Sequence, residues 1–361
     1  MRALIIGVDL GLPDYLAQRE EFDMLARGAG AHIVGEMTAR RDRPDAAYFI
    51  GSGKVQEVFD LLEQTEADIV LFDQPLSPAQ QRNLERKFNV RVVDRVALIL
   101  DIFALRAKSH EGKLQVELAQ LQHLSTRLTR MWSHLERQRG GIGMRGPGES
   151  QLEMDRRMIG DKVKVLKERL AKLQRQRTTQ RRARARGSSL SISLVGYTNA
   201  GKSTLFNALT RADAYAADQL FATLDTTTRR VWIEQAGQVT LSDTVGFIRD
   251  LPHTLIAAFR ATLEEAVHAD LLFHVVDASS DQRDEQIHQV QRVLTDIGAG
   301  DIPQIFVYNK IDNLGLPARI ERDPHGTIHK VLISAHHRDG LNLVRQAVAE
   351  FALRAETHAI H

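Results

Sequence analysis

The string Gly196-Tyr-Thr-Asn-Ala-Gly201-Lys202-Ser203 constrains the fold more than any other part of this chain. Its spacing, G-x-x-x-x-G-K-[ST], follows an apolar run at 190–195 that predicts a strand, and it precedes a predicted helix at 204–210. In that context the loop turns backbone N–H groups toward phosphate, and the helix N-terminus adds a partial positive charge. We therefore predict a phosphate-binding loop rather than an ordinary glycine turn. Lys202 is expected to reach the terminal phosphates, and Ser203 to bind a bridging Mg²⁺ ion.

The segment around this loop repeats strand-like and helix-like patterns. It predicts an α/β domain with a doubly wound, mainly parallel sheet, whose ligand loops lie at the carboxyl ends of the strands. Further strands are expected at 230–234, 239–242, 271–276, 305–308 and 331–333. Helices are expected at 255–269, 283–297 and 341–354.

The first 105 residues show the same alternation on a smaller scale. We predict a second α/β domain there, again with a mainly parallel sheet. Its expected strands are 3–8, 47–50, 68–72 and 90–93, and its expected helices are 14–27, 54–65 and 78–88.

The middle of the chain has a different pattern. Leu114, Leu121, Leu128 and Leu135 recur every seven residues, and a second apolar stripe runs through 159–173. Both stripes predict amphipathic helices with coiled-coil spacing, and the glycine-rich string 139–148 between them cannot stay helical. We expect an antiparallel helical hairpin with a basic tip. The predicted domains are thus 1–105, the basic hairpin 106–186 and the nucleotide-binding domain 187–355, with a tail at 356–361.

Charge is distributed unevenly along the chain. The net charge is only +2, yet residues 106–186 hold 21 Lys and Arg against 8 Asp and Glu, which leaves the remainder strongly acidic. This asymmetry suggests a polyanionic partner such as nucleic acid, although a solvated helical face would have the same composition. The chain contains no Cys, which excludes disulfides and thiolate metal sites. No apolar run of membrane-spanning length and no signal peptide is evident, so we expect a cytoplasmic protein without stable membrane insertion.

Three further motifs specify the nucleotide. Asp243-Thr-Val-Gly246 ends a predicted strand, where the Asp can hold magnesium through water and the Gly246 N–H can meet a γ-phosphate. Asn309-Lys-Ile-Asp312 ends another strand, and the Asp312 carboxylate suits the N1–H and exocyclic amine of guanine, which adenine lacks. Ser334-Ala335 follows the last strand, where a backbone N–H can meet guanine O6.

These motifs resemble the Ras-like GTPases. The resemblance makes 221–225 switch I, with Thr223 as the second magnesium hydroxyl when the γ-phosphate is present, although Thr226, Thr227 and Thr228 are nearby alternatives. Lys202, Thr223 and Gly246 are the expected catalytic residues, and Ser203 and Thr223 the expected metal ligands. The expected contacts of GTP are Gly196, Tyr197, Thr198, Asn199, Ala200, Gly201, Lys202, Ser203, Phe221, Ala222, Thr223, Leu224, Asp225, Asp243, Thr244, Val245, Gly246, Asn309, Lys310, Ile311, Asp312, Ser334, Ala335 and His336.

One position departs from the Ras-like pattern. The water-orienting Gln that often follows D-x-x-G is replaced by Phe247, which cannot orient water by hydrogen bonding. We therefore expect slow GTP hydrolysis by the isolated protein, with a partner completing the site. Arg249 and His253 are nearby candidates for the missing group, and the sequence does not choose between them.

Longer strings, above all Arg-Gly-Gly-Ile-Gly-Met-Arg-Gly-Pro-Gly-Glu-Ser-Gln-Leu-Glu at 139–153, resemble the HflX family of the Obg-HflX group. The resemblance implies a GTPase that binds the large ribosomal subunit and splits stalled ribosomes in a GTP-dependent manner. We expect the protein to be monomeric. Arg139, Arg145, Arg156 and Arg157 are the expected RNA contacts. Two alternatives stay open: a GTP-gated binding module for another RNA or a membrane protein, and ATP-dependent RNA remodelling by the N-terminal domain. Gly51-Ser-Gly-Lys54 could serve the latter, although an ordinary glycine turn fits this short string better.

Overall fold

The computed structural model describes residues 1–11, 14–131, 147–185, 189–210, 220–221, 223–249, 251, 255 and 260–359. The chain divides into two compact units. The N-terminal unit comprises Met1–Leu105 and Lys113–Leu170, and the C-terminal unit comprises Arg106–Gly112 and Ala171–His361. None of the described helices combines the length and the apolar character that a bilayer-spanning segment needs.

The N-terminal unit is built on a four-stranded sheet in the order β2-β1-β3-β4, and all of its neighbouring strands run parallel. The strands are β1 (Arg2–Asp9), β2 (His32–Arg40), β3 (Ile69–Phe72) and β4 (Arg91–Asp94). The helices are α1 (Tyr15–Gly28), α2 (Ser52–Thr65), α3 (Pro78–Phe88) and α4 (Arg95–Arg106). Apolar residues of β1 and β3, including Leu4, Ile6, Val70 and Phe72, are fully buried, as expected for strands covered on both faces.

One local prediction for this unit is wrong, and one strand was missed. Residues 47–50 do not form a strand; they lie in a turn in which Phe49 adopts a positive φ of 66° and bridges only to Asp45. The second strand is instead β2, which the sequence did not reveal because most of its side chains are only partly buried at the sheet edge. The mainly parallel sheet itself is confirmed.

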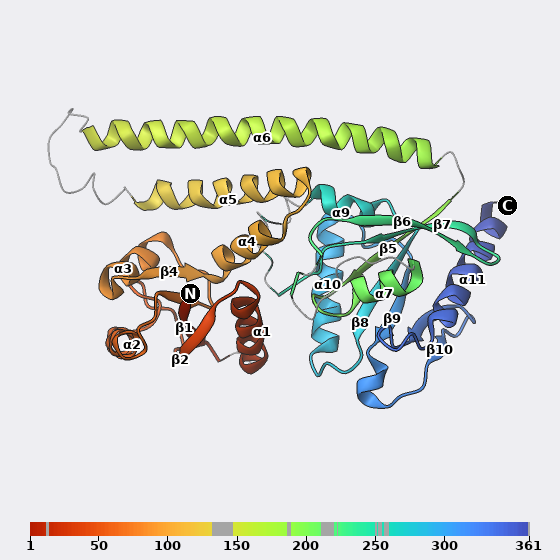
Figure 1. Ribbon diagram of the computed structural model, residues 1–361, viewed down its shortest axis with the longest axis horizontal. Coiled ribbons are helices and arrows are strands. Elements are labelled where there is room, and N and C mark those ends of the chain that lie inside the picture. Colours follow the sequence, from red (N-terminus) through yellow and green to blue (C-terminus); the bar gives the residue numbers. More distant parts are fainter. Residues whose placement is uncertain are drawn as a thin grey trace. The chain divides into compact units, whose positions relative to one another are not determined.

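Two long helices follow, α5 (His110–Met131) and α6 (Pro147–Ala185), which Figure 1 draws as extended rods. Their apolar stripes are only partly buried: Leu114, Leu118 and Leu166 are buried, whereas Leu124 is 46% exposed. Of the predicted tip at 139–148, all but the last two residues lie outside the described part of the chain.

The C-terminal unit contains a seven-stranded sheet in the order β10-β11-β9-β8-β5-β7-β6. Its five inner strands run parallel, and β6 and β10 pair antiparallel at the two edges. The strands are β5 (Leu190–Gly196), β6 (Thr227–Ile233), β7 (Gly237–Asp243), β8 (Leu271–Asp277), β9 (Gln304–Asn309), β10 (Arg319–Arg322) and β11 (Ile328–Leu332). The helices are α7 (Lys202–Thr210), α9 (Arg260–Val267), α10 (Arg283–Ile297), the short 3₁₀ helix η2 (Ile311–Leu314) and α11 (Leu341–Ala359).

This topology confirms the doubly wound, mainly parallel fold expected from the sequence. The helix expected at 255–269 is described from Arg260 onward as α9, and residues 256–259 lie outside the described part. Strand β10 was not predicted, because three of its four residues are charged and none of the four is buried. The carboxyl ends of β5, β7, β8 and β9 meet at one edge of the sheet, so their loops converge there.

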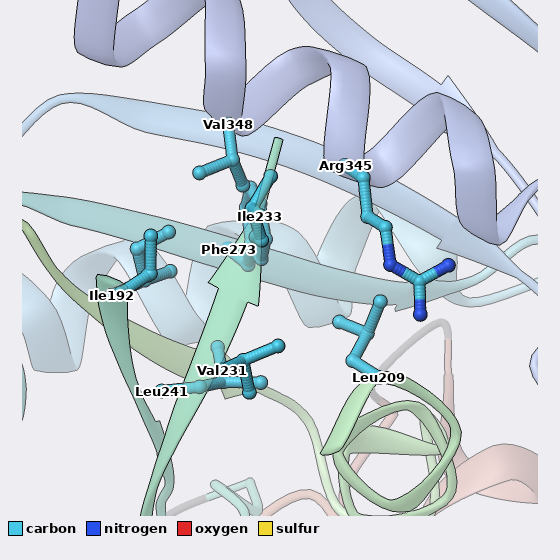
Figure 2. Close-up of a pocket in the computed structure, with 9 residues that line it drawn as sticks. Ile192, Leu209, Val231, Ile233, Leu241, Phe273, Arg345 and Val348 are labelled. Atoms are coloured by element: carbon cyan, nitrogen blue, oxygen red, sulfur yellow. The ribbon is translucent and has the colours of Figure 1, made fainter. Parts of the chain in front are cut away.

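The core of the C-terminal unit includes a small apolar pocket, shown in Figure 2. Its lining comes from the sheet, from Leu209 of α7, and from Arg345 and Val348 of α11. None of the lining residues belongs to the glycine-rich loop, and the pocket offers no cluster of polar groups to a ligand. The candidate functional site therefore lies elsewhere, at the carboxyl edge of the sheet.

Candidate functional site

The glycine-rich loop joins β5 to α7, and two of its glycines are sterically required. Gly196 has a φ of 148°, and a Cβ there would lie 2.2 Å from the Val275 carbonyl oxygen. Gly201 has a φ of 91°, and a Cβ would lie 2.1 Å from Nδ2 of Asn309. Both distances are far below van der Waals contact, so only glycine allows the loop to pack this closely against β8 and the end of β9.

Lys202, the first residue of α7, is held inside the loop. Its Nζ donates a hydrogen bond of 2.8 Å to the Tyr197 carbonyl oxygen, and the side chain is buried. Burial lowers the pKa of Lys202 to about 8, although the nearby Asp243 carboxylate acts in the opposite direction. A polyanionic ligand next to the buried Lys202 ammonium would raise its pKa again and keep the ammonium fully charged, so the site favours such a ligand.

Three oxygen-bearing side chains converge next to Lys202. The Ser203 hydroxyl lies 2.6 Å from the Thr223 hydroxyl, and both donate to Oδ2 of Asp243, at 2.7 and 2.9 Å respectively. The other carboxylate oxygen, Oδ1, is buried without a hydrogen-bond partner among the described residues. Burial raises the pKa of Asp243, while these two hydroxyls and Lys202 lower it.

This triad fits a hard divalent cation. Hydroxyl and carboxylate oxygens are the ligands that Mg²⁺ prefers, and a cation would satisfy the orphaned Oδ1 directly or through water. Among the described residues no group of three His, Asp or Glu side chains could hold a metal by itself, so substrate phosphates would complete the coordination. Thr223 belongs to the triad, whereas the Thr228 hydroxyl contacts Ser242 at 3.1 Å, which favours Thr223 among the candidate threonines.

The D-x-x-G segment pairs directly with the glycine-rich loop. The Phe247 N–H donates to the Gly196 carbonyl at 3.1 Å, and the Phe247 carbonyl accepts from the Thr198 N–H at 2.7 Å. The Arg249 N–H also donates to the Tyr197 hydroxyl at 2.8 Å. A Cβ at Gly246 would lie 3.0 Å from Lys202 Nζ, so this glycine lets the segment pass close over the lysine.

Phe247 itself is 1% exposed. With its side chain buried and both backbone polar groups paired, residue 247 has no group left to orient water, as the sequence predicted. Of the two nearby candidates for that role, Arg249 is largely buried and His253 lies outside the described residues.

The predicted base-binding residues lie together at the ends of β9 and β11. Asn309 is buried and connects three segments: its Nδ2 donates to the Ala200 carbonyl at 3.0 Å, and its Oδ1 accepts from the Ala335 N–H at 2.9 Å. The sequence offered a backbone N–H of the Ser334-Ala335 pair to guanine O6, and the N–H of Ala335 is engaged by Asn309 in this structure. Asp312 is partly exposed, and a hydrogen bond from the Ser334 side chain holds its pKa below the usual value.

Sequence reasoning missed two neighbours of these residues. Asp277, at the end of β8, forms an ion pair of 2.7 Å with Lys310, and Nε2 of His337 lies 3.8 Å from Asp312. Asp277 could have been found, because it ends a parallel apolar strand at the same sheet edge as Asp243 and Asn309. His337 carried no such signal.

The switch I prediction is only partly covered. Phe221 and Leu224 are buried, and Ala222 lies outside the described residues. The Asp225 carboxylate accepts hydrogen bonds from Lys108 and Ser109, so in this structure it is committed to the protein itself.

The remaining candidates differ in how well they are placed. Arg156 and Arg157 are exposed on α6, as an RNA contact requires, whereas Arg139 and Arg145 lie outside the described residues. Lys54 forms a surface ion pair of 2.6 Å with Glu57, and Gly51 has an ordinary φ of −61°. The string at 51–54 thus has the geometry of a plain helix start.

Comparison with known families and proteins matches successive parts of the chain. The family described as GTP-binding GTPase N-terminal matches residues 17–104, GTP-binding GTPase Middle Region matches 106–184, and 50S ribosome-binding GTPase matches 191–310. GTPase HflX of Escherichia coli (strain K12) is 52% identical over 332 residues, which cover 92% of this chain and 78% of that protein. GTPase HflX of Caldanaerobacter subterraneus subsp. tengcongensis is 45% identical over 359 residues, covering 99% and 82%.

Solved structures support the fold. A GTP-binding protein from the archaeon Sulfolobus solfataricus, in complex with GDP, aligns with a TM-score of 0.50 and 24% identity over 98% of this chain and all of that one. A second GDP complex, titled SsGBP, aligns with a TM-score of 0.52 at the same identity, over 98% of this chain and 99% of that one.

Proposed function

Because the chain belongs to the HflX family of GTPases, we propose that it uses GTP binding and hydrolysis to time its docking on the large ribosomal subunit. The observation that carries the proposal is that two features occur in one chain: a GTPase domain of the kind described as 50S ribosome-binding, and the strongly basic helical segment 106–186.

Different residues at the carboxyl edge of the sheet bind different parts of GTP. The glycine-rich loop and Lys202 take the phosphates, and Asp312 takes the guanine edge, while Asn309 holds the surrounding loops in place. Ser203 and Thr223 would hold Mg²⁺, with Asp243 beside them. A bound Mg²⁺ would neutralise charge on the terminal phosphates. Because Phe247 cannot orient water, hydrolysis by the isolated protein is slow and depends on a group that a partner supplies or reorganises.

The basic helices supply the contact with RNA. Phosphate contacts by Lys and Arg give affinity that is independent of sequence and falls as salt rises. Arg156 and Arg157 are exposed on α6 and available for such contacts, and Arg139 and Arg145 belong to the same proposal. Contacts that form in the GTP state stabilise the docked complex, and hydrolysis releases it. In this proposal, docking splits stalled ribosomes into subunits.

The proposal is tested by light scattering of intact ribosomes mixed with the protein. We expect scattering to fall in the presence of GTP or a non-hydrolysable analogue, and to stay constant with GDP or with the Lys202→Ala variant. Binding to another RNA or to a membrane protein without any effect on ribosomes would favour a GTP-gated module of a different kind. Unwinding of RNA with ATP that survives Lys202→Ala but is lost in Lys54→Ala would favour RNA remodelling by the N-terminal unit.

A further inference from the structure

The side chain of Asp225 is bound by a segment more than a hundred residues away in sequence. Its Oδ2 accepts hydrogen bonds from the Lys108 N–H at 2.9 Å and from the Ser109 N–H at 2.7 Å, and its Oδ1 accepts one from the Ser109 hydroxyl. Residues 106–112 belong to the C-terminal unit, so all of these contacts lie inside one compact body. The carboxylate is thus held by three donors from two consecutive residues.

The same serine caps a helix. Ser109 immediately precedes α5, and its hydroxyl accepts a hydrogen bond of 2.8 Å from the Gly112 N–H in the first turn. An anionic group at this end of a helix is favoured by the helix dipole, and a serine cap satisfies a backbone donor that would otherwise lack a partner. Asp225 and Ser109 together therefore fix where α5 begins.

The approach of Asp225 to α5 requires a glycine. A Cβ at residue 112 would lie 2.3 Å from Oδ1 of Asp225 and 3.1 Å from the Ser109 hydroxyl. Glycine in a helix costs stability relative to alanine, by an amount on the order of 1 kcal/mol. At Gly112 the absence of a side chain is what leaves room for the carboxylate.

Asp225 is also close to the nucleotide site along the chain. Thr223, two residues earlier, lies 2.6 Å from the Ser203 hydroxyl and 2.9 Å from Asp243. The intervening Leu224 is buried, and two residues of chain span at most about 7 Å. A large displacement of residue 225 must therefore carry Thr223 with it, and the reverse is equally true.

We propose that Asp225 is a positioning residue that couples Thr223 to the start of helix α5, so that GTP binding and the seating of residues 106–112 stabilise each other. The inference rests on the proposed role of Thr223 as the hydroxyl that acts only when the γ-phosphate is present. Coupling of this kind is reciprocal. A partner that displaces the start of α5 lowers the affinity of the protein for GTP, and GTP binding stabilises the position of the start of α5. GDP does not contact Thr223 in this proposal, so the affinity for GDP does not depend on the contact between Asp225 and residues 108–109.

The test compares affinities of the 361-residue chain for fluorescent GDP and for a fluorescent non-hydrolysable GTP analogue. Gly112→Ala inserts the clashing methyl group without removing a polar group, and Asp225→Asn removes the charge. We expect each substitution to lower the affinity for the GTP analogue about tenfold, equivalent to about 1.4 kcal/mol of binding free energy, and to change the affinity for GDP less than about twofold. Both should also raise KM for GTP. Ser109→Ala should lower the affinity for the GTP analogue by a smaller factor. Ser109→Thr keeps a hydroxyl at this position and should retain the affinity of the unmodified protein.

Gly53→Ala is the matched control, because Gly53 also lies in the first turn of a helix and a Cβ there meets nothing within 4 Å. It should leave both affinities unchanged. The proposed coupling would be overturned if Gly112→Ala and Asp225→Asn lost equal affinity for GDP and for the GTP analogue. It would also be overturned if neither variant lost affinity for the GTP analogue. Thr223→Ala separates this result from a failure of the proposed site: if that variant keeps its full preference for the GTP analogue, the role of Thr223 itself is wrong.

Discussion

Asn309 offers the sharpest test of how the nucleotide site is assembled. Its amide connects the glycine-rich loop, through the Ala200 carbonyl, to the segment after β11, through the Ala335 N–H, at 3.0 and 2.9 Å. Ala200 and Ala335 are 1% and 2% exposed, so water cannot replace the lost partner without rearrangement. Leaving a buried donor or acceptor unsatisfied costs about 1–3 kcal/mol each. With two such groups left unsatisfied, Asn309→Ala should lower the free energy of unfolding by about 2–6 kcal/mol.

The same substitution releases two loops that surround the ligand, so we expect GDP affinity to fall at least about tenfold. Urea unfolding and fluorescent GDP titration measure the two effects. Asn313→Ala is the matched control, since Asn313 is exposed and its amide only reaches the Ser279 hydroxyl at 3.1 Å. If Asn309→Ala had the same urea midpoint and GDP affinity as Asn313→Ala, the connecting role of Asn309 would be refuted.

Three further outcomes are expected. Asp312→Asn should shift base preference from GTP toward XTP, measured by competition binding, and an unchanged preference would mean that the guanine assignment is wrong. Phe247→Gln should not accelerate single-turnover hydrolysis, because position 247 is buried and its backbone is paired with the glycine-rich loop; a tenfold acceleration would contradict this geometry. Burial lowers the pKa of His274 to about 4, below the 6.5 of an unfolded histidine, so stability should fall by as much as about 3 kcal/mol as pH drops from 6.5 to 4. His274→Gln should flatten that dependence in urea unfolding, and an identical pH slope in both proteins would exclude His274 as its source.

The sequence predicted best where chemistry and local pattern coincide. Strand β5, the glycine-rich loop and α7 were predicted as a unit, because apolar burial, glycine spacing and the Lys-Ser pair are all local signals. The same holds for Asn309, the last residue of strand β9, and for Asp312, which follows that strand. Whether each residue contacts GTP as expected stays a prediction.

Edge strands and long-range contacts were predicted poorly. Strand β2 gave no strong periodic signal because its side chains are half exposed, while Phe49 and Ile50 proved to be buried at a turn rather than in a strand. The contact of Asp225 with residues 108–109 depends on tertiary folding and has no local signature. The Asp225 carboxylate, at the end of predicted switch I, was therefore expected to contact the nucleotide, whereas the structure engages it at the start of α5.

In our proposal, the nucleotide state controls binding to the large ribosomal subunit. Sedimentation of the 361-residue chain with purified large subunits tests this, in GDP and in a non-hydrolysable GTP analogue, at two salt concentrations. We predict co-migration with the GTP analogue that weakens as salt rises, and little co-migration with GDP. Absence of co-migration with every nucleotide, or equal binding in both states, would contradict the claim.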